Sequence, residues 1–243
     1  MEMTTTNTLL AFDTSTDLLS LALHTPSGDF MHESAGGALA SARLVPEAMA
    51  LLAEAGIELA RVDAIAFGAG PGAFTGLRTA CSVAQGLALG AGKPVVPVDS
   101  LMLVADDARE QVGLEAGGVV HVAMDARMDQ VYAGTYRWSG DGWTVVAAPE
   151  LLDPPVLAAR WRDDPPAVVA GSGLPVFAAA FALPAATRQV PEARSRAGAL
   201  LRVARQRFAA GAAVDAALAL PVYVRDKVAQ TTAEREAARE AKP

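Results

Sequence analysis

The sequence has very little cysteine and histidine, and it has no excess of positive charge. Of its 243 residues one is cysteine and three are histidine, and the formal net charge is −7. A single cysteine, Cys81, excludes an internal disulfide and any zinc site built from several thiolates. Because nucleic-acid binders usually present a basic surface, the acidic balance argues against binding of RNA or DNA by this chain alone.

Long apolar runs and targeting signals are also missing. No uninterrupted apolar stretch reaches the roughly 20 residues of a membrane-spanning helix. Residues 1–7 carry neither the basic start nor the apolar segment of a secretion signal. The apolar fraction of 52% is ample for a buried core in a chain of this length. We therefore expect a globular, cytoplasmic protein with no membrane association.

The first half of the chain alternates between strand and helix patterns. Apolar runs separated by turn residues predict a meander of three strands, at residues 9–13, 18–23 and 30–33. Helices are predicted at residues 38–55, 76–89 and 100–111, with strands at residues 63–67 and 94–98 between them. Thr75 is the expected N-cap of the second helix. Pro46 either opens the first helix after a preceding turn or kinks it.

A glycine-rich boundary near residues 115–118 precedes a second set of predicted strands and helices, whose patterns are less regular. Strands are predicted at residues 119–124, 130–138 and 167–170, helices at residues 175–181 and 194–210, and an extended piece at residues 221–225. Mixed sheets flanked by helices, present twice, indicate an α/β protein with two lobes. We expect these lobes to be residues 1–114 and 115–243, the second ending in a charged tail from about residue 233.

Two segments are candidates for phosphate binding. Gly70 and Gly72 lie between a strand and a helix N-terminus, where backbone N–H groups and the helix dipole favour anions. Their spacing matches neither a dinucleotide fingerprint nor a P-loop, so a simple tight turn is the competing interpretation. Asp13, Thr14 and Ser15 place an acid and hydroxyls at a strand end, which suits a metal ion and a phosphate. The alternative there is a hairpin whose turn is bonded to itself.

No catalytic constellation emerges from the remaining residues. The three histidines are widely separated in predicted strands, and no pair has helical i, i+4 spacing. No Gly-x-Ser-x-Gly elbow precedes a helix. Cys81 lies within an apolar helix, which is typical of an inert core residue.

Small side chains recur in rows on two predicted helices. The rows are Gly76, Ala80, Ala84 and Ala88 on the later helix, and Ala38, Ala42 and Ala50 on the earlier one. Such rows let another helix approach closely. They could equally pack on the protein's own sheet, and the sequence leaves both interpretations open.

Five arginines gather near the end of the chain: Arg194, Arg196, Arg202, Arg205 and Arg207. A run of charge is usually a solvated helix face. The alternative is a patch that touches an acidic partner or the edge of an RNA held by another subunit.

The stretch Gly70-Pro71-Gly72-Ala73-Phe74-Thr75-Gly76-Leu77-Arg78 resembles the most distinctive segment of the TsaB (YeaZ) family. Residues 9–16, the Asp125-Ala126-Arg127-Met128 hairpin and Pro221-Val222-Tyr223-Val224-Arg225 are similar to further family segments. The sequence departs from the family at Ala73, where Ser is common, and at Ala40, where a His often precedes Ser41. The resemblance implies a two-lobed actin-like/Hsp70-like ATPase fold, which is related to ribonuclease H.

The resemblance also implies a function in forming threonylcarbamoyladenosine (t6A) beside the anticodon of tRNA. In that pathway the paralogous TsaD transfers the threonylcarbamoyl group, with a metal held partly by two histidines on one helix. Ser100 and Val104 stand at the corresponding positions here, and valine offers no ligand atom. The resemblance therefore implies a non-catalytic partner of TsaD, with neither a catalytic set nor a metal site of its own.

Partners and cofactors follow from the same resemblance. It implies docking on TsaD through the helices at residues 38–55 and 76–89, or a homodimer through the same surface when TsaD is absent. The expected interface residues are Ala42, Ala50, Gly76, Ala80, Ala84 and Ala88. The ATPase TsaE would join the complex, the partner subunits would hold ATP and a metal ion, and tRNA would be contacted only through the complex. The alternative function is an autonomous Mg-ATP-dependent kinase or ATPase that uses Asp13, Thr14 and the glycine loop.

Overall fold

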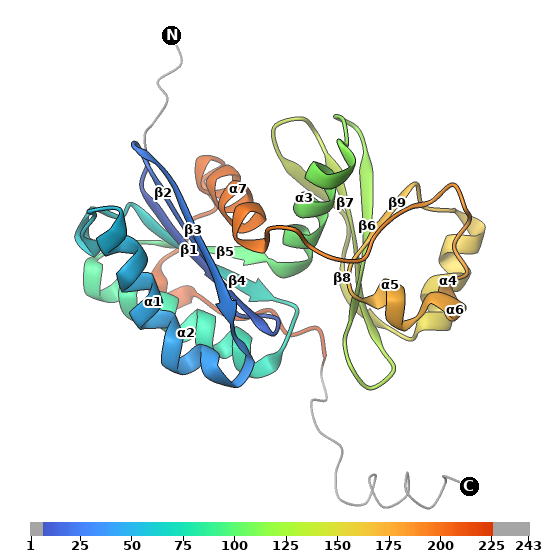
Figure 1. Cartoon of the computed structure of the whole chain (residues 1–243), viewed down its shortest axis with the longest axis horizontal. Coiled ribbons are helices and arrows are strands. Elements are labelled where there is room, and N and C mark those ends of the chain that lie inside the picture. The colour runs from blue at the N-terminus through green and yellow to red at the C-terminus, as the bar shows by residue number, and fades with distance from the viewer. Residues whose placement is uncertain (1–6, 226–243) are drawn as a thin grey trace, which may run out of the picture.

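The computed structural model describes residues 7–225, so the tail expected from about residue 233 lies outside the described part. The chain forms two lobes, each built on a five-stranded mixed sheet with flanking helices (Figure 1). The predicted two-lobed α/β fold is confirmed. Within residues 7–225 none of the helices has both the length and the apolarity needed to span a bilayer.

The first sheet has the strand order β3-β2-β1-β4-β5. Its strands are β1 (Leu9–Asp13), β2 (Leu18–Thr25), β3 (Gly28–Ala35), β4 (Ala64–Gly70) and β5 (Val95–Asp99). The predicted meander is confirmed, because β1, β2 and β3 pair antiparallel while β4 and β5 run parallel to β1. Both faces of β1 are buried: Leu10 and Phe12 belong to one apolar core and Leu9 and Ala11 to another.

The second sheet repeats this arrangement in the order β8-β7-β6-β9-β10. Its strands are β6 (Val119–Asp125), β7 (Val131–Trp138), β8 (Trp143–Leu152), β9 (Val168–Ala170) and β10 (Arg188–Val190). Its outer helices are α4 (Pro154–Asp163), α5 (Gly173–Val176) and α6 (Ala178–Phe181). The sequence did not predict β10, because three residues are too few for an alternating pattern to show.

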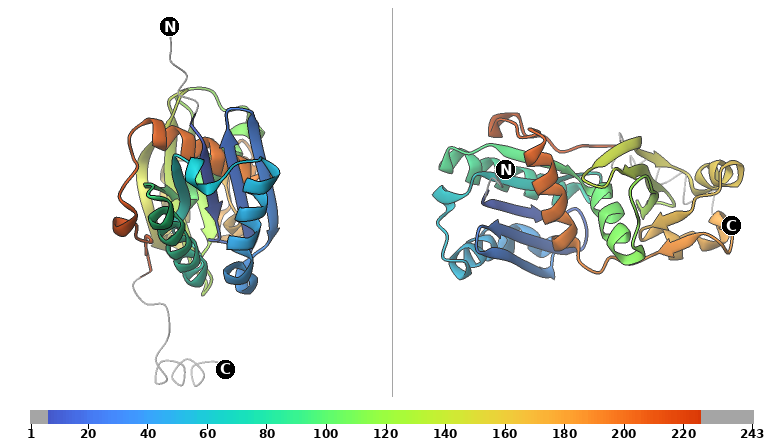
Figure 2. Two further views of the ribbon diagram at one scale, coloured as in Figure 1. Left: turned by 90° about the vertical axis from the view of Figure 1, so that its left-hand side faces the viewer. Right: turned by 90° about the horizontal axis from the view of Figure 1, so that it is seen from above.

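The remaining helices lie on the outer face of the first sheet or between the two sheets. They are α1 (Ala40–Glu54), α2 (Phe74–Ala91), α3 (Ser100–Val112) and α7 (Arg196–Ala209), with 3-10 turns at η1 (Gly37–Leu39), η2 (Leu59–Arg61) and η3 (Ala216–Leu218). Helices α1 and α2 pack on the outer face of the sheet, whereas α3 and α7 lie between the two sheets (Figures 1 and 2). The core around α3 and α7 includes the fully buried Tyr136 and Leu200 and joins the lobes.

The chain returns to the first lobe after completing the second. Helix α7 packs against β1 and β2, and Val214 exchanges backbone hydrogen bonds with Val95 at 2.8 and 2.9 Å. The expected assignment of residues 115–243 to a second lobe is therefore corrected, because the second sheet ends at Val190. The physical reason is that the apolar side of α7, including Leu200 and Val203, is buried between the two sheets.

Helix starts differ from the sequence prediction at two places. Helix α2 begins at Phe74 with Ala73 at the N-cap position, so Thr75 is not the cap. The Ala73 N–H donates to the Ser15 carbonyl oxygen at 2.8 Å, which fixes the backbone before Thr75 is reached. Pro46 lies inside α1 and does not open it.

Candidate functional site

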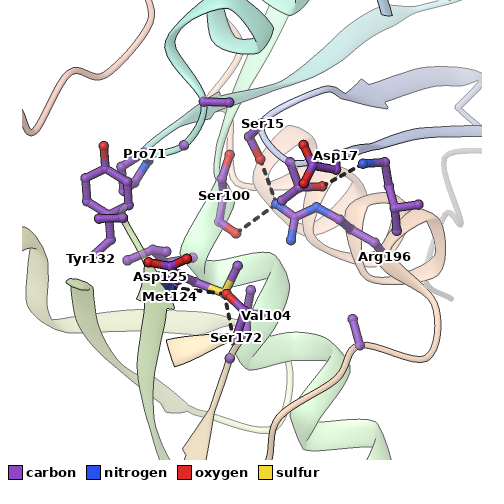
Figure 3. A pocket seen from close by; sticks show the side chains of 18 of the residues that line it. Ser15, Asp17, Pro71, Ser100, Val104, Met124, Asp125, Tyr132, Ser172 and Arg196 are labelled. Carbon is purple, nitrogen blue, oxygen red and sulfur yellow. Dashed lines mark hydrogen bonds between the residues drawn. The ribbon is translucent and has the colours of Figure 1, made fainter. Parts of the chain in front are cut away.

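A cavity of about 750 Å³ lies between the two lobes. Its first-lobe wall comes from the turn after β1, the glycine loop before α2 and the first turns of α3 (Figure 3). Its second-lobe wall includes Asp125 and Ser172, and Arg196 and Arg225 complete the lining. The cavity therefore brings together segments that are far apart in the sequence.

The turn after β1 packs directly against the glycine loop. A Cβ atom at Gly72 would lie 2.5 Å from the Ser15 carbonyl oxygen, and one at Gly76 would lie 1.8 Å from that of Thr14. The Thr14 hydroxyl donates to the Gly76 carbonyl oxygen at 2.7 Å. These glycines are needed because two backbone segments touch, which supports the tight-turn interpretation of the loop.

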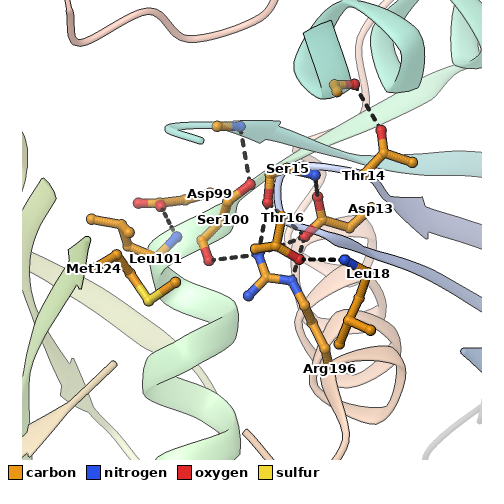
Figure 4. A network of polar contacts seen from close by, with 12 residues as sticks. Asp13, Thr14, Ser15, Thr16, Leu18, Asp99, Ser100, Leu101, Met124 and Arg196 are labelled. Atoms are coloured by element: carbon orange, nitrogen blue, oxygen red, sulfur yellow. Dashed lines mark hydrogen bonds and ion pairs between the residues drawn. The ribbon is translucent and has the colours of Figure 1, made fainter. Parts of the chain in front are cut away.

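The Asp13 carboxylate is neutralised inside the protein by Arg196 (Figure 4). Arg196 Nε donates to Asp13 Oδ2 at 2.7 Å, and Nη2 lies 2.6 Å from the same oxygen. Nη2 also donates to Ser15 Oγ at 2.8 Å and to the Ser100 carbonyl oxygen at 3.3 Å. Asp13 is 1% exposed and Arg196 5%, so the pair is fully withdrawn from water. It anchors the start of α7 to the end of β1.

The solvated-face interpretation of the five arginines is wrong for Arg196 and incomplete for Arg202. Arg202 Nε donates at 2.6 Å to Asp106, whose side chain is buried. Arg194 precedes α7, and its backbone N–H donates to Asp107 at 3.0 Å. The arginines therefore have separate structural environments rather than one shared solvated face.

The residues at the end of β1 do not fit a magnesium-bound nucleotide. Such a ligand would need a free carboxylate there, but Asp13 Oδ1 accepts from the Ser15 N–H at 2.7 Å. Oδ2 accepts from the Ser15 hydroxyl at 3.0 Å and from Arg196, whose guanidinium is the cation beside this carboxylate. Of the candidate phosphate-binding residues, Asp13 and Ser15 thus bond to each other and Gly72 packs against Ser15, whereas Thr14 bonds to Gly76 and Gly70 to Ser100.

Helix α3 presents Ser100 and Val104 to the cavity, one turn apart. These are the positions at which the resemblance places the metal-binding histidines of TsaD. Ser100 Oγ accepts from the Gly70 N–H at 3.2 Å, and Val104 supplies only apolar surface. Among residues 7–225 no three His, Cys, Asp or Glu side chains are grouped to hold a metal ion.

Asp99 fixes the start of α3 and ties it to the second lobe. Its Oδ1 accepts from the backbone N–H groups of Leu101 (2.8 Å) and Met102 (3.3 Å), and its Oδ2 from the Tyr136 hydroxyl of β7 (2.7 Å). Burial raises the pKa of the Asp99 carboxyl, and these hydrogen bonds oppose that shift. Burial and the neighbouring Asp99 also raise the pKa of Tyr136, so its hydroxyl remains a donor.

Replacing Tyr136 with phenylalanine should lower the free energy of unfolding by about 1.5 kcal/mol at pH 7, because a hydrogen bond to a charged group is lost. The loss also raises the Asp99 pKa further. A carboxyl whose pKa is raised on folding binds more protons in the folded state, so its contribution to stability falls as pH rises through the window between the unfolded and folded pKa values. The loss in free energy of unfolding caused by Tyr136→Phe should therefore be larger at pH 7 than at pH 4.5, as measured by urea unfolding. Equal losses at the two pH values would contradict this account.

The segment Pro221–Arg225 crosses the first lobe beside the cavity. The Val222 N–H donates to the Ala69 carbonyl oxygen at 2.7 Å, at the end of β4. The Tyr223 ring packs on Phe74 of α2, with 5.1 Å between the ring centroids. Residues 221–225 are therefore extended, as predicted, and they pack against the first lobe without forming a strand.

Arg225 carries this connection to the second lobe. Its guanidinium donates to the Ala126 carbonyl oxygen at 2.9 Å and to Gln130 Oε1 at 2.7 Å, in the β6–β7 hairpin. Residues 127–129 of that hairpin all have positive φ angles, between 54° and 61°, which are unusual outside glycine. Arg225 therefore stabilises a strained turn of the second lobe and connects it to residues 221–225, which pack on the first lobe.

The row of small residues on α2 faces the protein's own sheet. Ala80, Ala84 and Ala88 are 0% exposed, and Gly76 is buried against Thr14. The prediction that Gly76, Ala80, Ala84 and Ala88 form an intermolecular surface is therefore wrong. The row is small because α2 packs closely on β4 and the turn after β1.

The outward faces of α1 and α2 present a different, charge-poor surface. Ala42 and Ala50 are exposed on α1, and their predicted contact with a partner stays a prediction. Exposed apolar side chains beside them are Val45 (38%) and Met49 (42%), and α2 adds Leu89 (62%). Of the exposed residues of α1 only the last, Glu54, is charged. Apolar surface of this kind often marks an interaction site.

Arg196 and Tyr136, which form the buried contacts with Asp13 and Asp99, were not identified from the sequence as site residues. Arg196 begins the otherwise apolar stretch Arg196-Ala197-Gly198-Ala199-Leu200-Leu201, and that setting is the one available sign of burial. Tyr136 is a polar ring in a predicted strand, which gives no indication of its partner. Both partners lie far away in the sequence, at Asp13 and Asp99.

Comparisons with known proteins match the chain to a TsaD family model and to TsaB and YeaZ proteins. A profile described as "TsaD: tRNA N6-adenosine threonylcarbamoyltransferase" matches residues 21–233. A protein of Escherichia coli (strain K12) named tRNA threonylcarbamoyladenosine biosynthesis protein TsaB is 33% identical over 91% of this chain and 96% of its own. A Haemophilus influenzae protein of the same name is 44% identical over 51% and 52%. The structure of YeaZ from Pseudomonas aeruginosa, 38% identical, has a TM-score of 0.79 and covers 89% of this chain and 99% of that one.

Two sheets of the same strand order, with helices and a cavity between them, define a protein of the actin-like/Hsp70-like ATPase fold. The chain belongs to the TsaB (YeaZ) family within that class. The resemblance drawn from residues 70–78 is therefore confirmed.

Proposed function

We propose that this chain is a non-catalytic subunit for t6A formation in tRNA and that it docks on the transferase TsaD. The names of its relatives support the pathway. The observation that carries the non-catalytic assignment is the buried Asp13–Arg196 pair, because it engages the carboxylate that an autonomous Mg-ATP enzyme of this fold would need. The same pair disfavours the alternative kinase or ATPase function.

The outward face of α1 and α2, with Ala42 and Ala50, is the proposed docking surface for TsaD. Its exposed apolar side chains support this assignment, and the same face would permit a homodimer when TsaD is absent. TsaE would join the complex, ATP and a metal ion would act in the partner subunits, and tRNA would be contacted through the complex.

A rigid connection between the lobes also supports a scaffolding function. The Tyr136 hydroxyl of β7 donates to Asp99 of the first lobe, and Arg225 connects residues 221–225 to the β6–β7 hairpin. An enzyme that opens and closes its lobes around a nucleotide has to break such contacts in each cycle. A subunit that stabilises the conformation of a partner can keep these contacts between its lobes permanently.

Replacing Gly86 with tryptophan tests the docking surface. Gly86 is exposed on α2, and a Cβ atom there would meet nothing within 4 Å, so the side chain should not disturb the fold. Binding to the purified TsaD paralogue should weaken by about tenfold or more, since a bulky ring prevents close helix packing. Ala84→Trp is unsuitable for this purpose because Ala84 is buried.

Val156→Trp, at an exposed position of α4 in the other lobe, is the matched control. It should bind the paralogue as the wild type does in a pull-down and in size-exclusion chromatography. Unchanged binding by Gly86→Trp would exclude this face. A tRNA-modification assay with each protein omitted in turn tests the non-catalytic assignment, which fails if the chain alone modifies tRNA.

A further inference from the structure

A second cavity of about 720 Å³ lies at the C-terminal half of α7. It is bounded by the start of β1, the end of β2 and the β7–β8 hairpin, and its walls include Arg202, Arg205, Arg207 and Trp143. It shares no lining residue with the cavity between the lobes, which meets the other end of α7 at Arg196.

The charge of this second cavity is unusual for a chain whose net charge is −7. Arg202 is neutralised by Asp106 at 2.6 Å. Within residues 7–225, Arg205 and Arg207 form no ion pair. The acidic residue in the lining is Asp141, which accepts from the Ser139 hydroxyl at 2.7 Å. The lining thus contains three arginines and one aspartate, and the Arg207 charge also opposes the rise that burial causes in the pKa of the nearby Asp99 carboxyl.

One of these guanidinium groups has an unsatisfied donor. The Nε atom of Arg207 is buried and has no acceptor among the described residues. Cationic side chains are favoured near a helix C-terminus, which accounts for arginines in the last turns of α7. It does not account for a buried N–H without an acceptor, because such groups normally have a partner.

We propose that this cavity binds the phosphate of a nucleotide or of an RNA strand. A guanidinium group matches phosphate oxygens with paired N–H donors, and both Arg205 and Arg207 line this cavity. The volume suits a single nucleotide unit, and the aromatic Trp143 in the wall is the type of side chain on which bases stack. Free nucleotide and RNA backbone share this phosphate chemistry, and the experiment distinguishes them.

The experiment measures binding to the full chain alone, so it does not depend on the proposed docking to TsaD. The probes are inorganic pyrophosphate, ATP without magnesium, and a labelled single-stranded RNA of twelve nucleotides, each in low salt. Arg205→Glu is the test variant because Arg205 is exposed and its replacement should leave the fold intact. Arg162→Glu, at an exposed position of α4, makes the same charge change and is the control.

We expect Arg205→Glu to weaken binding by about tenfold and to reduce the salt dependence of RNA binding by about one unit of log–log slope, whereas the control is unchanged. RNA bound more tightly than ATP and pyrophosphate identifies a strand as the ligand; ATP bound more tightly than pyrophosphate and RNA identifies a mononucleotide. Equal losses in both variants, or no binding of any probe to the wild type, would overturn the proposal. If binding occurs but the TsaD pull-down fails, the proposed function fails and the phosphate site stands.

Discussion

Replacing Arg196 with methionine is expected to lower the free energy of unfolding by about 3–5 kcal/mol, because it leaves the buried Asp13 carboxylate without its counterion. The Asp13 carboxylate is 1% exposed, so in the wild type its charge is balanced by Arg196 and not by water. The variant also loses the hydrogen bonds to Ser15 and to the Ser100 carbonyl oxygen. Urea unfolding followed by circular dichroism measures the change.

The double variant Asp13→Asn/Arg196→Met should recover much of this loss, since removing both charges leaves no uncompensated ion. Arg162→Met, at an exposed position, is the matched control and should change stability by less than about 0.5 kcal/mol. A loss below about 1 kcal/mol for Arg196→Met would mean that the buried pair is not a main stabilising contact of this fold.

Alanine should have opposite effects at two glycines of the same helix. At Gly76 of α2 the new Cβ atom would lie 1.8 Å from the Thr14 carbonyl oxygen, so the turn after β1 must move. We expect a loss of about 3 kcal/mol from this overpacking. At Gly86 the new Cβ atom meets nothing within 4 Å, and alanine should stabilise the helix by about 0.5–1 kcal/mol.

Thermal and urea unfolding of the two single variants, compared with the wild type, measure both effects. Because the substitution is the same, the difference between the two positions reports the packing around Gly76 and not helix propensity. Similar stability changes at both positions would contradict the close contact between α2 and the turn after β1.

Local patterns were sufficient to predict most of the fold. The turn residues after Asp13 and at residues 26–29 separate the strands of the meander, and alternating or apolar runs identify β1, β4 and β6. The repeated strand order of the two sheets was not visible as a sequence repeat, because topology is set by pairing between distant strands. The return of α7 to the first lobe was missed for the same reason.

The site was harder to predict because its contacts are long-range. Arg196 and Asp13 are separated by 183 positions. Arg196 is one of five arginines in and near a predicted helix, and charged helix residues are usually exposed to solvent. The row from Gly76 to Ala88 was recognised, but spacing does not tell which neighbour the small residues face. The glycine loop and residues 13–15 were each identified, whereas their mutual contact required the structure.

The lobe that carries α1 and α2 is assembled from the two ends of the chain. Its sheet is complete by Asp99, yet the face containing Leu9 and Ala11 is covered by α7, which leaves the ribosome about a hundred residues later. The second lobe, from β6 to β10, is one uninterrupted stretch. During synthesis the second lobe can therefore close first, and the first lobe keeps an exposed apolar face, to which chaperones can bind, until α7 has been synthesised.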